Sequence, residues 1–221
     1  MGKLIENLLK EKGDEVVVII DDTDKNLSAS ELAEKLKGAD VAIDFSIAEA
    51  VLRNVEACLV ANIPLVEGTT GWNGEKETVK DLVKKYEGTF VFGANFSIGV
   101  NLFYRIVSNA SELFAKFSEY EIFIEERHHS RKKDAPSGTA LKLKDIVSEH
   151  ITREFSVAAT RAGNIPGTHI VGFDSPADTV ELTHTARSRE GFASGSILAA
   201  KWIIGKKGFW EFTEVMDEIL K

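Results

Sequence analysis

Residues 39–72 read ADVAIDFSIAEAVLRNVEACLVANIPLVEGTTGW, and this stretch decides the fold. It opens with a short apolar run and continues with a longer segment whose apolar residues recur at helical spacing. A second apolar run then leads into a Gly-Thr-Thr-Gly turn. Short runs rich in Val and Ile on both sides of a helix are typical of strands buried in a parallel sheet. The stretch therefore predicts a strand, a crossover helix and a second, parallel strand.

The same alternation covers the first hundred residues. Apolar periodicity with capping residues indicates further helices, and continuous β-branched or aromatic runs indicate further strands. The helices are predicted over 3–13, 28–38 and 76–88, and the strands over 14–22 and 89–97. We expect an α/β fold with a Rossmann-like, doubly wound parallel sheet, which binds its ligands at the carboxyl ends of the strands.

The pattern changes after residue 97. Helices are predicted over 99–117, 137–151 and 192–208, and strands over 120–129, 154–163, 169–173 and 179–186. The last two strands are close enough in sequence to form an antiparallel pair. Small residues in the final helix would let it approach a sheet closely. We therefore expect an α/β domain formed by 1–97 and 190–221, with an α+β domain, 98–189, inserted into it.

Composition excludes several classes of protein. The formal net charge of −8 argues against nucleic acid or an anionic membrane as the main partner. The single cysteine, Cys58, rules out an intramolecular disulfide and fits a reducing cytoplasm. No apolar run approaches the about 18 residues of a membrane-spanning helix, and no signal peptide is evident. We expect a cytoplasmic protein.

Three features at strand ends point to a nucleotide. Asp21 directly follows the apolar part of the run VVIIDD, where dinucleotide-binding folds place a ribose-binding carboxylate, although a solvated aspartate at a turn gives the same pattern. EGTTG (67–71) and GANFSIG (93–99) combine glycines with hydroxyl side chains, which lets a ligand approach the backbone. Each stretch alone is equally typical of a tight turn. Because all three belong to one edge of the predicted sheet, together they favour a nucleotide site.

A second candidate site is HHSRKKDAPSGTA, residues 128–140, which concentrates positive charge in an acidic chain. Ser137, Gly138 and Thr139 open a predicted helix, whose free N–H groups and positive dipole end attract an anion. Lys132 and a histidine beside that helix end would form a carboxylate pocket with groups that donate a proton near neutral pH. A basic loop before an ordinarily capped helix explains the same residues without a ligand.

Metal and nucleophile chemistry are disfavoured in this stretch. His128 and His129 follow a strand, so they point to opposite sides, and no third ligand lies at metal spacing. We therefore expect no metal site. Ser137 does not belong to a G-x-S-x-G elbow, which argues against a serine nucleophile.

Four further polar residues are distributed over the second half of the chain. Arg161 and Arg189 are candidates to bind a substrate carboxylate through a bidentate guanidinium. His169 and His184 fall in predicted strands, and we interpret both as structural histidines.

Five motifs together resemble one enzyme family. They are EGTTGW, GANFSIGVN, EERHHSRKKDAPSGTA, RAGNIPGTHIVGF and ARSREGFASGSILAAKW. In this order they are similar to the 4-hydroxy-tetrahydrodipicolinate (dihydrodipicolinate) reductase family of bacterial lysine and diaminopimelate biosynthesis. The resemblance implies NADH- or NADPH-dependent reduction of 4-hydroxy-tetrahydrodipicolinate to tetrahydrodipicolinate, in a homotetramer built through the inserted domains.

The resemblance also implies a role for individual residues. His128 is similar to the family's proton donor and acceptor, and Lys132 to its proton donor. The residues that match substrate contacts are His129, Gly138, Thr139 and Arg189. The residues that match cofactor contacts are Asp21, Gly68, Thr69, Thr70, Gly93, Ala94, Asn95 and Phe96. Asp22 follows Asp21 with no arginine nearby to bind a 2′-phosphate, which favours NADH over NADPH.

One departure from the family lies at the start of the chain. The family begins with a strand and a G-x-x-G-x-M-G loop, whereas this chain starts at MGKLIENLLK, whose first two residues resemble the end of that loop. Such a loop binds the pyrophosphate at a helix N-terminus. One interpretation is a working reductase whose true start lies upstream. The alternative is a shortened paralogue that binds the dicarboxylate without reducing it.

Overall fold

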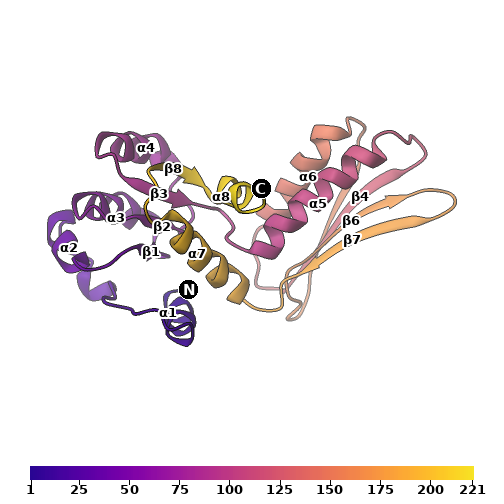
Figure 1. Ribbon diagram of the computed structural model, residues 1–221. Helices are drawn as coiled ribbons and strands as arrows, with labels where there is room; N and C mark the ends of the chain where they lie inside the picture. Colours follow the sequence, from indigo (N-terminus) through magenta and orange to yellow (C-terminus); the bar gives the residue numbers. More distant parts are fainter. The chain divides into compact units, whose positions relative to one another are not determined.

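The computed structural model describes all residues from 1 to 221 and divides into two compact units (Figure 1). The first unit consists of Met1–Ile98 and Glu190–Lys221, and the second of Gly99–Arg189. None of the helices has the length and apolar character that crossing a bilayer requires.

The first unit is built around a four-stranded parallel sheet in the order β1-β2-β3-β8. The strands are β1 (Ala42–Asp44), β2 (Leu65–Glu67), β3 (Thr89–Phe92) and β8 (Gly208–Glu211). The helices are α1 (Gly2–Glu11), α2 (Ala29–Leu36), α3 (Ala48–Val60), α4 (Lys76–Lys85), α7 (Glu190–Ile203) and α8 (Phe212–Ile219), with short 3-10 turns at Asp22–Asp24 and Asn73–Glu75. The predicted α/β class and parallel sheet are confirmed.

Local sequence explains these helices and their packing. Ser28 caps α2 in a reciprocal pair with Glu31, and α2, α3 and α4 bury their apolar residues in one core with β2 and β3. Cys58 lies in this core, where burial raises the pKa of its thiol to about 12. The small residues of α7 are buried as expected, and the helix packs against β1, β2 and β3.

The strand predicted over 14–22 does not form. Residues 14–20 are extended, and their side chains alternate between exposed and half-buried, but no neighbouring strand pairs with them. Val17 and Ile19 are 52% and 56% exposed, whereas Val18 and Ile20 pack against the core under α2 and α3. The side-chain pattern of a strand is present, and only the hydrogen-bonding partner is missing.

One further prediction was wrong near the end of the chain, and one strand was not predicted. The helix predicted over 192–208 ends at Ile203, and β8 begins five residues later and pairs in parallel with β3. The short sequence GFWE gave no strand signal of its own. Phe209 stacks on Phe90 at 5.4 Å between ring centroids, so tertiary packing decides this strand.

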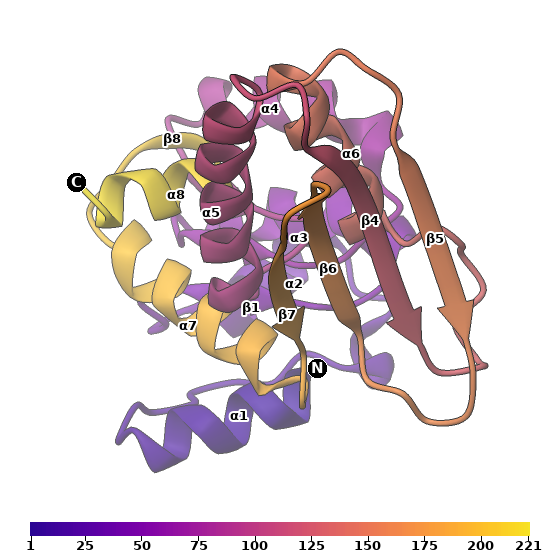
Figure 2. The same ribbon diagram turned by 90° about the vertical axis from the view of Figure 1, so that its right-hand side faces the viewer.

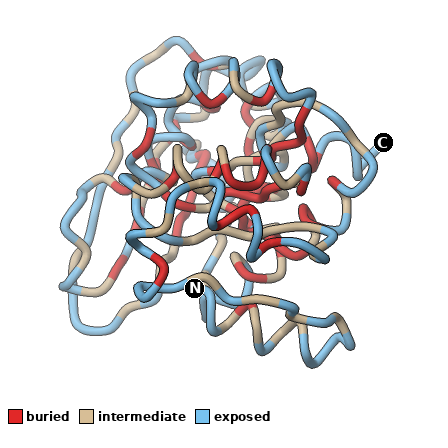
Figure 3. Tube along the Cα trace, turned by 90° about the vertical axis from the view of Figure 1, so that its left-hand side faces the viewer, coloured by how far each residue is buried: buried red, intermediate tan, exposed pale blue.

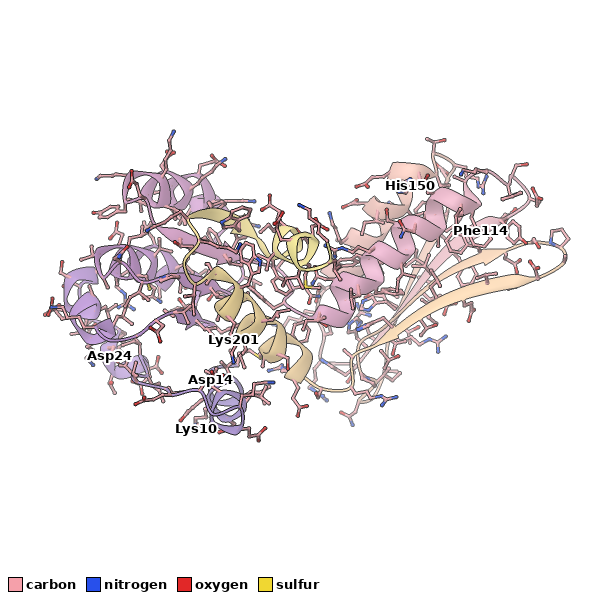
Figure 4. All side chains as sticks on the ribbon, viewed as in Figure 1. Lys10, Asp14, Asp24, Phe114, His150 and Lys201 are labelled. Atoms are coloured by element: carbon pink, nitrogen blue, oxygen red, sulfur yellow. The ribbon has the colours of Figure 1, made fainter.

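Helix α1, next to the N-terminus, buries little of its surface (Figure 3). Ile5 is its only buried residue, and it packs with Ala193 and Ile197 of α7. After the helix, Asp14 and Lys201 point toward one another and form an ion pair at 2.8 Å (Figure 4).

The second unit is a four-stranded mixed sheet in the order β5-β4-β6-β7. The strands are β4 (Glu121–His128), β5 (Ser156–Arg161), β6 (Thr168–Asp174) and β7 (Thr179–Thr185), and the helices are α5 (Ile98–Phe114) and α6 (Gly138–His150). The pair β4–β5 is parallel, and the other two pairs are antiparallel. Residues from α5, α6, β4 and β6 form one core on the helical side of the sheet (Figure 2).

The unpaired segment makes a testable prediction about amide exchange. The amides of 16–20 have no backbone acceptor, so we expect them to exchange at close to the unprotected rate. Val66 and Val91 lie in central strands and should exchange about 10³-fold more slowly, because their opening requires most of the unfolding free energy. Hydrogen–deuterium exchange read by NMR measures both. Equal protection of 16–20 and Val66 would contradict the unpaired conformation.

Candidate functional site

The first candidate site lies where β1 and β2 end. An open pocket of 410 Å³ is lined by Met1, Phe45, Ser46, Ile47, Ala48, Glu49, Gly68, Thr69 and Thr70. At Gly68 a Cβ would lie 2.2 Å from the Phe45 ring, so only glycine allows this close approach. The predicted cofactor residues Gly68, Thr69 and Thr70 are therefore together at the carboxyl edge of the sheet.

Hydrogen bonds fix the two turns that line this pocket. The Ser46 amide donates to Asp44 Oδ1 at 2.8 Å and to Thr69 Oγ1 at 3.0 Å, which connects the turn after β1 to the turn after β2. The Thr69 carbonyl accepts a hydrogen bond from Trp72 Nε1 at 2.9 Å. These hydrogen bonds hold the two turns beside one another at the pocket.

The other predicted cofactor residues are not among the pocket's lining. Gly93–Phe96 follows β3, beside β2, but the Phe96 side chain is buried and packs on Phe45 and Phe212. Asp21 caps a 3-10 turn, and its carboxylate accepts hydrogen bonds from the amide and the hydroxyl of Thr23, which lower its pKa. The structure thus brings one of the three predicted nucleotide features into the pocket.

A buried carboxylic acid lies directly behind the pocket. Glu67 ends β2, is fully buried, and accepts a hydrogen bond from the Thr69 amide at 2.7 Å. Its Oε2 is buried without a hydrogen-bond partner. Burial, and then the carboxylate of Asp44 on the neighbouring strand, raise the pKa of Glu67 to about 9. Glu67 is therefore protonated at neutral pH and acts as a neutral support for the Thr69 turn.

Glu67→Gln should change how stability depends on pH. The folded wild type keeps the Glu67 proton up to about pH 9, whereas the unfolded chain releases it above about pH 4.5. Rising pH therefore favours unfolding of the wild type over this window, by up to about 1.4 kcal/mol per pH unit, and not of the variant. Urea unfolding at several pH values should show the variant gaining relative stability as pH rises. Glu15→Gln, at an exposed position, is the control, and parallel curves for Glu67→Gln would contradict the assignment.

The second candidate site is a polar cluster on the helical side of the second sheet. Alternation along β4 places Glu126 and His128 on the same face as the core residues Ile122 and Ile124. Register then places His169 of β6 opposite Glu126, and Arg161 of β5 opposite His128. The cluster therefore collects residues that are far apart in the sequence.

Glu126 is the centre of this cluster. Its Oε1 accepts hydrogen bonds from the Ser137 amide at 2.9 Å and from Arg161 Nη2 at 2.5 Å. Its Oε2 lies 3.3 Å from His128 Nδ1 and 3.6 Å from His169 Nε2. Burial raises the pKa of Glu126, but the hydrogen bonds from Ser137 and Arg161 outweigh it and leave the pKa lowered. The cluster thus contains a buried, ionised carboxylate.

The two histidines are held in their neutral forms. Burial lowers the pKa of His128, and the negative charge of Glu126 opposes this shift. Burial, and then the proximity of His128, lower the pKa of His169 to about 4. The Ser137 hydroxyl accepts a hydrogen bond from the Ala140 amide and contacts His169 Nε2 at 3.1 Å, so it serves as a helix cap.

The loop and helix beside the cluster present the remaining predicted residues. Lys132 pairs with Asp134 at 2.9 Å, and Gly138, the first residue of α6, is exposed with open space around it. Thr139 follows in the first turn of α6, and His129 lies half-buried after β4. Arg189 is exposed and forms no hydrogen bond or ion pair with the cluster.

Sequence reasoning missed part of this cluster. Glu126 is not among the residues that the sequence singles out, and it lies within 4 Å of both His128 and His169. Arg161 was expected to bind a substrate carboxylate, but its Nη2 binds Glu126 and the Asp134 carbonyl. The i, i+2 spacing of Glu126 and His128 in one strand was the signal available.

The cluster also has the composition of a metal site. Glu126, His128 and His169 offer ligand atoms within 4.8 Å of one another, which the spacing around His128 did not reveal. Arg161, however, donates to the same carboxylate and neutralises the charge that would attract a cation. The arrangement is better explained as a hydrogen-bonding network around a buried carboxylate.

Comparisons with known proteins point to one family over nearly the whole chain. The family model described as "Dihydrodipicolinate reductase, N-terminus" matches residues 1–96, and the model described as "Dihydrodipicolinate reductase, C-terminus" matches 99–216. The 4-hydroxy-tetrahydrodipicolinate reductase of Christiangramia forsetii is 34% identical over 233 residues, covering 100% of this chain and 95% of that protein. The 4-hydroxy-tetrahydrodipicolinate reductase of Methanosarcina barkeri is also 34% identical, and the match covers 98% of this chain and 95% of that protein.

A solved structure supports the fold. The dipicolinate-bound dihydrodipicolinate reductase from Paenisporosarcina sp. TG-14 has a TM-score of 0.81 with this chain. The two are 21% identical, and the match covers 97% of this chain and 94% of that one.

Proposed function

The chain belongs to the dihydrodipicolinate reductase family, and from this premise we propose that it reduces 4-hydroxy-tetrahydrodipicolinate to tetrahydrodipicolinate with NADH or NADPH. The observation that carries the proposal is the Glu126 cluster. Glu126 accepts a hydrogen bond from the Ser137 amide at the start of α6, and its Oε2 lies 3.3 Å from Nδ1 of the His128 ring. A titratable histidine therefore lies beside a helix N-terminus suited to a carboxylate.

The chain's own residues supply binding and proton transfer. The N-terminus of α6, exposed at Gly138, would bind a substrate carboxylate with Thr139, and His129 and Arg189 are our further candidates for substrate contacts. Hydride addition to a conjugated imine leaves negative charge on the substrate, which a positioned acid must neutralise. We assign this role to Lys132, with His128 as proton donor and acceptor.

The pocket at the end of β1 and β2 suits a dinucleotide. Gly68 leaves the backbone uncovered, and Thr69 and Thr70 offer hydroxyl and amide groups at the carboxyl edge of the sheet. NADH or NADPH would supply the hydride. Asp21 and the residues Gly93, Ala94, Asn95 and Phe96 remain proposed cofactor contacts. We also propose that the enzyme is a cytoplasmic homotetramer assembled through Gly99–Arg189.

Replacing the proposed proton donors should abolish turnover without unfolding the protein. We expect His128→Gln and Lys132→Met each to lower kcat by about 10²- to 10⁴-fold, because each removes a group that transfers a proton. The oxidation of NADH with freshly generated substrate measures the rate. Lys133→Met is the matched control, since Lys133 is exposed and adjacent to Lys132. Equal rates for His128→Gln and wild type would contradict the assignment.

The acidic pair Asp21 and Asp22 predicts the cofactor preference. Their charges repel a 2′-phosphate, so we expect kcat/KM to be higher with NADH than with NADPH by about tenfold. Asp21→Ala should reduce this ratio. A higher kcat/KM with NADPH would contradict the preference.

Calorimetry separates the reductase from a non-reducing dicarboxylate-binding protein. Titration with NADH and, separately, with dipicolinate should show binding of both ligands. If the chain binds dipicolinate but binds neither NADH nor NADPH, the result would favour the binding protein and contradict the proposed reduction.

A further inference from the structure

We propose that Glu126 is the positioning residue of the proposed proton-transfer site: its buried carboxylate holds the Nδ1 side of His128, so that Nε2 is the nitrogen that exchanges a proton with the substrate. This inference deepens the proposed function and rests on it. Its physical basis is the asymmetry between the two ring nitrogens of His128.

The Nδ1 side of the ring lies beside the Glu126 carboxylate. Nδ1 is buried without a hydrogen bond, and Glu126 Oε2, at 3.3 Å, is an acceptor beside it. Glu126 Oε2 is likewise buried and unpaired, whereas Oε1 is occupied by Ser137 and Arg161. A small rotation would convert this contact into an Nδ1–H···Oε2 hydrogen bond.

The Nε2 side remains open. Nε2 forms no hydrogen bond, and it is absent from the buried, unpaired atoms that include Nδ1. Gly167 lies against Nε2, where a Cβ would approach to within 3.0 Å. The missing side chain therefore leaves the reactive nitrogen uncovered.

Arg161 keeps Glu126 in the role of an acceptor. Its guanidinium binds Oε1, which stabilises the ionised carboxylate and prevents it from taking the histidine proton. The result is a neutral His128 with its proton on Nδ1 and a lone pair on Nε2. When Nε2 takes a proton, the negative charge of Glu126 stabilises the imidazolium.

Several charged or titratable groups face His128 and affect its titration. They are Glu126 on β4, Arg161 on β5, His169 on β6, and Lys132 and Asp134 in the loop before α6. Glu126 and Asp134 raise the pKa of His128, whereas Arg161 and Lys132 lower it. Removing the Glu126 charge should therefore move the His128 titration to lower pH.

The test compares Glu126→Gln with Glu125→Gln. Glutamine preserves the size of Glu126 and an oxygen for Ser137 and Arg161, but it removes the charge. Glu125 is adjacent, alternates to the opposite face of β4, and pairs with Arg127, so it is a matched control. We expect Glu126→Gln to lower kcat by about 10- to 100-fold and to shift the His128-dependent limb of the pH–rate profile to lower pH. Glu125→Gln should change neither.

NMR of the ring nitrogens distinguishes positioning from a merely structural role. In the wild type, ¹⁵N shifts should show the neutral His128 ring protonated at Nδ1, and its titration should move to lower pH in Glu126→Gln. A ring protonated at Nε2 in the wild type would overturn the proposal, and this measurement needs no variant to fold. Lost activity with an unchanged His128 titration would also overturn it.

The NMR measurement does not require the chain to turn over substrate. A chain that fails to oxidise NADH but shows the Nδ1–H tautomer and the shifted titration would contradict the proposed reduction while retaining the Glu126–His128 arrangement.

Discussion

The buried carboxylate of Glu126 is the constraint on which the second unit depends. An ionised carboxylate inside a protein is costly unless it is hydrogen-bonded, and removal of a partner costs several kcal/mol. Glu126 Oε1 accepts hydrogen bonds from the start of α6 and from β5, and Oε2 lies 3.3 Å from His128 Nδ1 on β4 itself. Satisfying this one group therefore fixes where α6 begins relative to the sheet, and with it the position of the open helix N-terminus.

Each unit buries a glutamate carboxyl group, which is ionised in the second unit and protonated in the first. Glu67, the last residue of β2, and Glu126, two residues before the end of β4, are both buried beside a candidate ligand site. Arg161 and the Ser137 amide keep Glu126 ionised, so it can stabilise a proton on a neighbouring ring. Glu67 has only one amide donor and faces the carboxylate of Asp44, so it keeps its own proton. Environment, not residue type, decides which carboxyl group carries charge.

The extended segment 14–20 shows the limit of local pattern in the first unit. Its β-branched residues alternate in exposure as a strand requires, and Val18 and Ile20 contact the core. A strand nevertheless needs a hydrogen-bonding neighbour, and none lies beside it. The short strand β8 is the reverse case. Its sequence GFWE carries no clear strand pattern, but it forms a strand because it pairs with β3 and because the Phe209 ring packs on Phe90 and Phe92.

The sequence by itself determined the α/β class, the inserted second unit, the glycine turn after β2 and the basic stretch before α6. Each of these follows from periodicity or from residue types that are adjacent in the chain, which is information that a sequence carries directly. Only the tertiary structure decided that Glu126, His128, Arg161 and His169 form one cluster, because strand register brings them together across more than forty residues. Register also decided that Arg161 binds the protein's own carboxylate, since a buried charge takes the nearest partner that the fold provides.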